Sequence, residues 1–138
     1  MIQRDINSEE AMIEFGEELA KNLSFPSTIE LIGDVGTGKT TITKGIAKGL
    51  GIKEEITSPS FTLSKRYNFG DKTLVHYDFY RLAEPGIMSE DLLENVSDQN
   101  TVVVVEWADS VAELLPEKHL KLEITLNDDG TRTIKELS

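Results

Sequence analysis

A glycine-rich stretch between an apolar run and a helical pattern constrains the fold of this chain more than any other feature. It reads IELIGDVGTGKTTITKGIAKGL over residues 29–50, and residues 33–40 match the pattern G-x-x-x-x-G-K-[ST] at every fixed position. The apolar residues before the loop predict a short strand, and the periodicity after it predicts a helix from Lys39 to about Leu50, ended by Gly51. A strand, a glycine loop and a helix in this order are typical of a phosphate-binding loop.

The chemistry of this loop predicts a nucleoside triphosphate as its ligand. Its glycines permit backbone angles that aim successive N–H groups inward, so the loop becomes an anion receptor at a helix N-terminus. Lys39 is expected to stand in a solvated loop and to reach the β- and γ-phosphates, and Thr40 to offer its hydroxyl to Mg²⁺. The alternative is a structural glycine turn with an incidental lysine. The residues predicted to bind the nucleotide here are Gly33, Asp34, Val35, Gly36, Thr37, Gly38, Lys39, Thr40 and Thr41.

Two acidic residues follow buried-strand patterns and are the predicted metal carboxylates. Asp78 follows TLVHY, and Glu106 follows TVVVV, whose four consecutive valines indicate a central parallel strand buried on both faces. Ligands of open α/β sheets bind at the carboxyl ends of strands, so one acid could hold Mg²⁺ while the other orients the attacking water. The alternatives are a solvated strand end for Glu106 and a turn cap for Asp78. Trp107 either stacks near the nucleotide or belongs to the core. The predicted catalytic residues are Lys39, Asp78 and Glu106, and the predicted metal residues are Thr40, Asp78 and Glu106.

The remaining patterns complete an α/β fold. Helical spacing predicts one helix over residues 8–23 and another from Ser89. Alternating residues on both sides of NFGDK predict a hairpin over residues 61–80, and the alternation in residues 120–126 before NDDG predicts a final antiparallel pair. We expect one domain over residues 1–138. Its predicted fold is a P-loop NTPase-like mixed sheet, whose parallel nucleotide-binding centre is extended by antiparallel strands, with helices on both faces.

Charge and composition narrow the function further. Lys and Arg number 14 against 25 Asp and Glu, and the net charge of −11 disfavours direct binding of nucleic acid by this chain alone. The two histidines, His76 and His119, are far apart in the sequence, so any metal is expected to be a hard ion held by oxygens. The segment MIQRDINSEE lacks the pattern of a secretion signal, cysteine is absent, and no apolar run approaches about 20 residues. A cytoplasmic location without membrane contact is expected.

The nucleotide and the reaction are predicted from the other motifs. The guanine-specific string N-K-x-D does not occur, so ATP is expected rather than GTP. The segment TSPS over residues 57–60 could sense the γ-phosphate or the metal, with Thr57 as a ligand, or it could be a proline-stiffened connection. Phosphoryl transfer often needs an arginine that a partner supplies. Arginine is scarce in this chain, which favours slow hydrolysis alone and faster hydrolysis inside a complex. The four arginines are Arg4, Arg66, Arg81 and Arg132.

Four motifs together resemble a known family. GDVGTGKTT, TSPSFTL, HYDFYRL and VVEWAD, in this order and in so short a chain, resemble the TsaE (YjeE) family, from the first predicted helix to the final hairpin. The resemblance implies a bacterial cytoplasmic, Mg²⁺-dependent ATPase that is required, with the TsaD–TsaB pair, for making threonylcarbamoyladenosine beside the anticodon of tRNA. It further implies that TsaD performs the transfer and that ATP hydrolysis resets this machine between turnovers.

The resemblance also implies roles for particular residues. Asp78 stands in the family's Walker B position, and Glu106 is similar to a metal-site carboxylate. Residues 57–61 look like the family's switch loop. Glu9 and the final turn around Arg132 are similar to places where family members approach the nucleotide base. The residues implied to serve the phosphates and Mg²⁺ are Lys39 and Thr40.

Two other functions stay open from the sequence. A small-molecule kinase would need an acceptor pocket and a cationic lid, and the sequence indicates neither. A module that senses ATP and binds a protein without turnover would need only the phosphate loop. Phosphate release measured with and without TsaD–TsaB distinguishes the three. For a partner-activated ATPase, phosphate release is higher when TsaD–TsaB is present. For a sensing module there is no release in either case, and a kinase places the phosphate on a metabolite.

Overall fold

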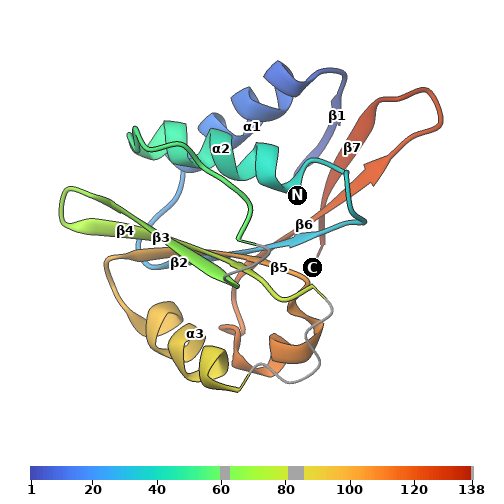
Figure 1. Cartoon of the computed structure of the whole chain (residues 1–138). Coiled ribbons are helices and arrows are strands. Elements are labelled where there is room, and N and C mark those ends of the chain that lie inside the picture. Colours follow the sequence, from blue (N-terminus) through green and yellow to red (C-terminus); the bar gives the residue numbers. More distant parts are fainter. Residues whose placement is uncertain (60–62, 81–85, 138) are drawn as a thin grey trace. The chain divides into compact units, whose positions relative to one another are not determined.

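The computed structural model of the 138-residue chain describes residues 1–59, 63–80 and 86–137 (Figure 1). The chain divides into two compact units. Unit 1 comprises Met1–Leu23, Leu31–Thr57 and Lys121–Ser138, and unit 2 comprises Ser24–Glu30 and Ser58–Leu120. Strand β2 (Ser27–Ile32), predicted from the apolar run before the glycine loop, runs from unit 2 into unit 1. One domain over residues 1–138 stays a prediction.

In unit 1 the sequence provides a capping residue at the start of one helix and at the end of the other. Helix α1 (Glu9–Lys21) begins after Ser8, whose Oγ accepts a hydrogen bond from the N–H of Ala11 at 3.0 Å. Helix α2 (Lys39–Leu50) is followed by Gly51, whose φ of 88° is a conformation that glycine adopts at little cost. Both predicted helices are therefore confirmed, α1 with slightly shorter bounds than 8–23.

Helices α1 and α2 lie side by side in unit 1, because glycines let their backbones approach closely (Figure 1). A Cβ atom on Gly45 would lie 2.2 Å from the carbonyl oxygen of Ile13, and one on Gly16 would lie 2.5 Å from that of Ile42. Both distances are shorter than any real contact of a Cβ atom. The apolar side chains buried on the two helices are Met12, Phe15, Leu19, Ala20, Ile42, Ile46 and Ala47.

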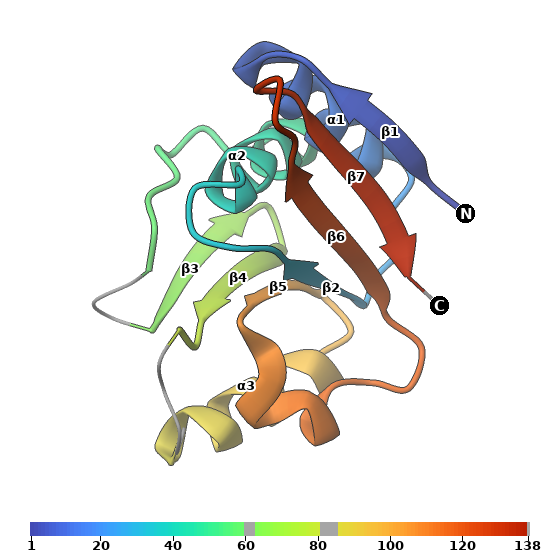
Figure 2. The same ribbon diagram turned by 90° about the vertical axis from the view of Figure 1, so that its right-hand side faces the viewer.

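The strands of unit 1 form antiparallel pairs with β7 in the middle (Figure 2). Strand β6 (Leu120–Leu126) pairs with β7 (Arg132–Leu137) through the predicted turn, and β1 (Gln3–Ile6) pairs with the other edge of β7. The predicted final pair is confirmed. Strand β1 was not predicted, because three of its four residues are exposed and its sequence shows no alternation.

Unit 2 contains a parallel strand pair extended by an antiparallel strand. Strand β3 (Ser64–Phe69) pairs antiparallel with β4 (Lys72–Asp78), and β4 pairs parallel with β5 (Thr101–Glu106), all six residues of which are buried. The predicted hairpin and the predicted buried parallel strand are confirmed. Residues 61 and 62 of that hairpin prediction lie outside the described residues.

Two short helices of unit 2 differ from the sequence prediction. Helix α3 (Ile87–Ser97) begins two residues before the predicted Ser89, after Gly86. The 3₁₀ helix η1 (Ala108–Leu114) was not predicted, because a short helix of this kind leaves little periodicity in the sequence. Parallel and antiparallel pairs occur together with helices, which confirms the predicted mixed α/β fold. Within the described residues, no helix is both long enough and apolar enough to span a membrane.

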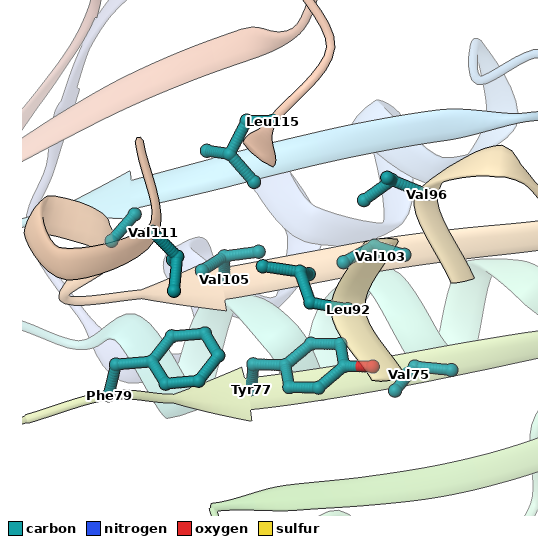
Figure 3. Packing of buried hydrophobic residues seen from close by; sticks show 10 residues of the cluster. Val75, Tyr77, Phe79, Leu92, Val96, Val103, Val105, Val111 and Leu115 are labelled. Carbon is teal, nitrogen blue, oxygen red and sulfur yellow. The ribbon is translucent and has the colours of Figure 1, made fainter. Parts of the chain in front are cut away.

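One face of β4 and β5 carries an apolar cluster that also involves α3 and η1 (Figure 3). Alternate residues of the two strands point into it, and the rings of Tyr77 and Phe79 stack with their centroids 5.6 Å apart. Because side chains alternate along a strand, the intervening residues point to the other face. That other face carries the polar residues at the carboxyl ends of β4 and β5, namely His76, Asp78 and Glu106. The labelled members of the cluster are Val75, Tyr77, Phe79, Leu92, Val96, Val103, Val105, Val111 and Leu115.

A hydrogen-bonded network ties β3, β4 and α3 together at the edge of this cluster. The hydroxyl of Tyr77 donates to Asp91 at 2.5 Å and accepts a hydrogen bond from the amide of Asn95 at 2.6 Å. Arg66 donates to the amide oxygen of Asn95 at 2.9 Å. Burial, and then the hydrogen bond to Asp91, raises the pKa of Tyr77 above its ordinary value of 10.0.

We expect Tyr77→Phe to lower the free energy of unfolding by about 1–3 kcal/mol near neutral pH, because Asp91 and Asn95 lose a partner. A raised pKa means that the folded state holds the tyrosine proton more tightly than the unfolded chain. Its contribution is therefore present below pH 10.0 and is lost as the pH rises above that value. Urea unfolding at several alkaline pH values should show a steeper loss of stability in the parent than in Tyr77→Phe. Parallel curves for the two proteins would contradict this role of Tyr77.

Candidate functional site

The residues singled out from the sequence fall into two sets, one in each unit. Unit 1 holds the glycine loop, the start of α2, Glu9 and Arg132. Unit 2 holds Asp78 and Glu106 at the carboxyl ends of β4 and β5. Each set is built by its own local chain geometry.

The glycines of the loop occupy positions that other residues would not tolerate. A Cβ on Gly33 would lie 2.7 Å both from the carbonyl oxygen of Ile124 and from Oγ1 of Thr37. Gly36 and Gly38 have φ values of 85° and 112°, in the left-handed region that favours glycine. The backbone of the loop therefore requires glycine at all three positions. A simple structural turn, the alternative considered from the sequence, would not need all three.

The start of α2 presents N–H groups that the helix does not use. A hydrogen bond runs from the N–H of Ile42 to the carbonyl of Gly38 at 2.9 Å, so the N–H groups of residues 40 and 41 precede the first acceptor that the helix offers. Helix α2 has no acidic residue in its first turn, whereas α1 has Glu9 and Glu10 there. Its positive end is therefore not neutralised by side chains of its own first turn and favours an anion.

Lys39 lies in a different environment from the one the sequence suggested. A solvated loop lysine was expected, but Lys39 is only 6% exposed, and its Nζ donates to the carbonyl oxygens of Gly33 and Asp34. The expectation of a solvated lysine is wrong, because the loop curls around the ammonium group. The lysine therefore stabilises the loop as well as supplying positive charge inside it.

The other loop residues differ in exposure. Asp34, Val35 and Gly36 are exposed, Thr40 and Thr41 are half-buried, and Thr37 is buried. The hydroxyl of Thr37 donates to the carbonyl of Asp34 at 2.9 Å, and its N–H reaches the same carbonyl at 3.3 Å. Thr37 therefore closes the loop from inside, while Thr40 stays partly accessible at the first turn of α2.

Arg132 bonds directly to the loop from the start of β7. Its Nε donates to the carbonyl of Thr37 at 2.8 Å, and its Nη2 donates to that of Gly36 at 3.2 Å. Helix α1 also approaches the loop, since a Cβ on Gly38 would lie 3.0 Å from Cε of Met12, one turn after the exposed Glu9. The roles of Glu9 and Arg132 at a nucleotide base stay predictions.

We expect Arg132→Gln to loosen the loop, because a shorter neutral side chain cannot make both of these hydrogen bonds. Amide hydrogen exchange of residues 34–38 should become faster than in the parent, while exchange in α3 of unit 2 stays unchanged. Unchanged exchange in the loop would show that the two hydrogen bonds contribute nothing to its order.

The two carboxylates of unit 2 are neighbours on paired strands. Asp78 and Glu106 are partners in the parallel register of β4 and β5, and they are 6% and 4% exposed. The solvated strand end considered for Glu106 is therefore wrong. One oxygen of Asp78 accepts a hydrogen bond from the N–H of Tyr80 at 2.9 Å, so Asp78 does cap the turn that follows.

His76 is the residue that the sequence reasoning missed. Its Nε2 lies 2.5 Å from Oε2 of Glu106, and its side chain is fully buried. The sequence did carry a signal, because His76 stands two positions before Asp78 and must share its face of β4. Which partner it meets depends on the pairing of β4 with β5, and this pairing cannot be read from one strand alone.

Trp107 follows Glu106 with a φ of 56°, unusual for a residue with a side chain. It packs against the apolar cluster of unit 2, and its ring centroid lies 4.7 Å from that of Tyr80. These contacts support the core alternative for Trp107. Thr57 is exposed, and its predicted role as a sensor of the nucleotide stays a prediction. Residues 60 and 61 of the predicted switch loop, and Arg81, lie outside the described residues.

The loop of unit 1 has donors of the kind that suit a phosphate, and the carboxylates of unit 2 have oxygens of the kind that suit a magnesium ion. No group of three or more His, Cys, Asp or Glu side chains that could hold a metal occurs in the described part of the chain. Magnesium differs from metals that need such a cage, because it is commonly held by one or two carboxylates plus the phosphates of the substrate. The glycine loop supplies N–H groups and a lysine for phosphate, and unit 2 supplies two carboxylates.

Fold and loop together define a mixed α/β protein with a phosphate-loop motif between a strand and a helix. The model of the family described as "Threonylcarbamoyl adenosine biosynthesis protein TsaE" matches residues 6–134, and the chain belongs to this family. It is 42% identical to the tRNA threonylcarbamoyladenosine biosynthesis protein TsaE of Streptomyces coelicolor, over 82% of this chain and 78% of that protein. It is 33% identical to the protein of the same name from Haemophilus influenzae, over 91% of this chain and 82% of that one.

A solved structure supports the same assignment. The crystal structure of Bacillus subtilis YdiB is similar to this chain with a TM-score of 0.81 and 32% sequence identity, and the match covers 98% of this chain and 83% of that one. The similarity in fold confirms the predicted architecture, and the family match confirms the resemblance inferred from the four motifs.

Proposed function

We propose that this chain is an ATPase that binds ATP and Mg²⁺ and acts in the biosynthesis of threonylcarbamoyladenosine in tRNA. In this proposal it works with TsaD and TsaB, and it supplies ATP turnover rather than the transfer of the threonylcarbamoyl group. The names of its relatives support the pathway. The net charge of −11 supports a protein that leaves contact with tRNA to its partners.

The observation that carries the proposal is the glycine loop at the start of α2. Three glycines with restricted surroundings or positive φ, the N–H groups at the start of α2 and a buried Lys39 occur together in one short segment. This combination favours an extended polyanion such as a nucleotide triphosphate over a single carboxylate. In the proposal, Lys39 and the loop amides bind the β- and γ-phosphates.

The proposed metal residues are Thr40, Asp78 and Glu106. A hydroxyl and two carboxylates are oxygen donors of the kind that Mg²⁺ prefers. When bound, Mg²⁺ would neutralise charge on the phosphates. The contribution of this chain is to hold the carboxylates at the ends of rigid paired strands, with Asp78 partly fixed by the N–H of Tyr80.

The arginines of the chain support activation by a partner. Each of the three arginines in the described residues is already engaged in unit 1 or unit 2. Arg4 pairs with Glu18, Arg66 bonds to Asn95, and Arg132 bonds to the loop carbonyls. A γ-phosphate in phosphoryl transfer gains much from a nearby arginine, and that arginine can come from another protein. Slow hydrolysis by the chain alone and faster hydrolysis in a complex follow from this.

Phosphate release tests the proposal most directly. The purified chain is incubated with ATP and Mg²⁺, alone and with the TsaD–TsaB pair, and released phosphate is measured over time. The proposal predicts low release alone and higher release with the pair. No release in either case would favour a sensing module, and phosphate found on a metabolite would favour a kinase.

We expect Glu106→Gln to raise the Mg²⁺ concentration that gives half-maximal turnover by about tenfold, because the substitution keeps the shape and removes a negative charge. Glu113→Gln, which removes an exposed carboxylate on η1, is the matched control and should leave the Mg²⁺ dependence unchanged. Superimposable Mg²⁺ titrations of Glu106→Gln and the parent would make Glu106 a structural residue.

A further inference from the structure

His76 and Glu106 form a buried pair on the face of β4 and β5 opposite the apolar cluster. The side chain of His76 is 0% exposed and that of Glu106 is 5% exposed, and the contact between Nε2 and Oε2 measures 2.5 Å. A carboxylate buried to this extent needs a hydrogen-bond donor. Its neighbour in the parallel register, Asp78, is a second acid and cannot be that donor while it is ionised. The donor is therefore the imidazole.

The second ring nitrogen shows where the imidazole proton resides. Nδ1 of His76 is buried and has no hydrogen-bond partner among the described residues. If Nδ1 carried the proton, an N–H group would be buried without an acceptor, and a lone pair on Nε2 would face the carboxylate. With the proton on Nε2, the ring donates to Glu106 and only a lone pair lacks a partner. The geometry thus favours the tautomer that is protonated on Nε2.

The hydrogen bond from His76 uses only one of the two carboxylate oxygens of Glu106. Oε2 faces His76, and no hydrogen bond to Oε1 is found in the described part of the chain. The carboxylate is attached to the last residue of a fully buried strand, so its backbone has little freedom. A donor fixed to one oxygen therefore determines the direction of the other one.

We propose that His76 is a positioning residue, whose Nε2–H holds one oxygen of Glu106 and so orients the other toward a bound magnesium ion. The proposal rests on the proposed function, because it gives Glu106 a metal to serve. It assigns no contact between His76 and the metal or the nucleotide. Replacing a residue that hydrogen-bonds to a metal ligand commonly lowers metal affinity by about 10- to 100-fold.

The first test measures the tautomer in the protein without nucleotide or metal. Long-range ¹H–¹⁵N spectra of imidazole-labelled protein give separate signals for protonated and unprotonated ring nitrogens. Because the chain has only two histidines, the signals that vanish in His76→Gln belong to His76. We expect a protonated Nε2 and an unprotonated Nδ1, and we expect Glu106→Gln to shift the Nε2 signal. Protonation on Nδ1 would overturn the proposal.

The second test compares two substitutions of similar shape. In His76→Gln a side-chain amide replaces the imidazole and can still donate a hydrogen bond. In His76→Met a thioether replaces the imidazole and offers no donor. Binding of Mg²⁺ is measured by calorimetry in the presence of a non-hydrolysable ATP analogue, and folding is checked by urea unfolding. We expect His76→Met to weaken Mg²⁺ binding by about tenfold or more, while His76→Gln stays close to the parent. Equal weakening in both variants, or in neither, would overturn the proposal.

The outcome also separates this proposal from the proposed function. If the parent binds neither ATP nor Mg²⁺, the proposed function is contradicted, and the orientation of Glu106 toward a metal is contradicted with it. If the parent binds both and the two variants do not differ, the proposed function stands and only the role of His76 is overturned.

Discussion

Replacing Lys39 with alanine is expected to lower ATP turnover by about 10²- to 10³-fold, the loss that follows when one preorganised donor to a developing negative charge is removed. The ammonium group is held inside the loop by the carbonyls of Gly33 and Asp34, so it is already in place before a nucleotide arrives. Because these carbonyls also lose a partner, we expect the free energy of unfolding to fall by about 1 kcal/mol. The loss of turnover should therefore far exceed the loss of stability.

Lys44 provides the matched control for this substitution. It lies on the same helix with an exposed side chain, so Lys44→Ala removes the same charge without touching the loop. Phosphate release and urea unfolding are measured for both variants and the parent. We expect Lys44→Ala to behave like the parent in both assays. If Lys39→Ala released phosphate at the rate of the parent, the proposed role of Lys39 would be wrong.

The second large effect is expected at the contact between α1 and α2. Alanine is a better helix former than glycine by about 1 kcal/mol, so Gly45→Ala would stabilise an isolated helix. In this protein the added methyl group would lie 2.2 Å from the carbonyl oxygen of Ile13 and 3.0 Å from Cα of Gly16. These are backbone atoms, which cannot move aside without separating the helices. We expect the clash to dominate and the free energy of unfolding to fall by about 2–3 kcal/mol.

Urea unfolding of Gly45→Ala tests this expectation, with Lys44→Ala as the control for helix propensity at the neighbouring position. Lys44 is exposed, so its replacement should change stability by no more than about 0.5 kcal/mol. If Gly45→Ala were as stable as the parent or more stable, the close approach of α1 and α2 would be wrong. Reduced nucleotide binding in Gly45→Ala would further link this helix contact to the loop, because α2 begins directly after Gly38.

The parts of the fold that depend on local chain chemistry could be predicted from the sequence. The glycine loop was predicted because its backbone angles demand particular residues at fixed spacing. Strand β5 was predicted because four consecutive valines suit only a strand buried on both faces. Helix α2 ends at Gly51 as expected, because few other residues accept that conformation.

The parts that depend on distant partners could not be predicted. Arg132 and Thr37 are 95 residues apart in the sequence, and only the folded chain brings the guanidinium to the loop carbonyl. His76 and Glu106 come from different strands, so their contact depends on the register of β4 and β5. The burial of Lys39 could not be predicted either. Backbone carbonyls enclose its ammonium group, and their direction depends on the path of the loop rather than on which residues form it.

Calorimetric titration of the folded chain with ATP in the presence of Mg²⁺ tests the central claim most directly, which is that the loop of residues 33–40 binds the phosphates of a nucleotide. We predict measurable heat and about one nucleotide per chain, with binding greatly weakened in Lys39→Ala and unchanged in Lys44→Ala. Absence of heat with folded parent protein, or equal binding by Lys39→Ala, would contradict the claim.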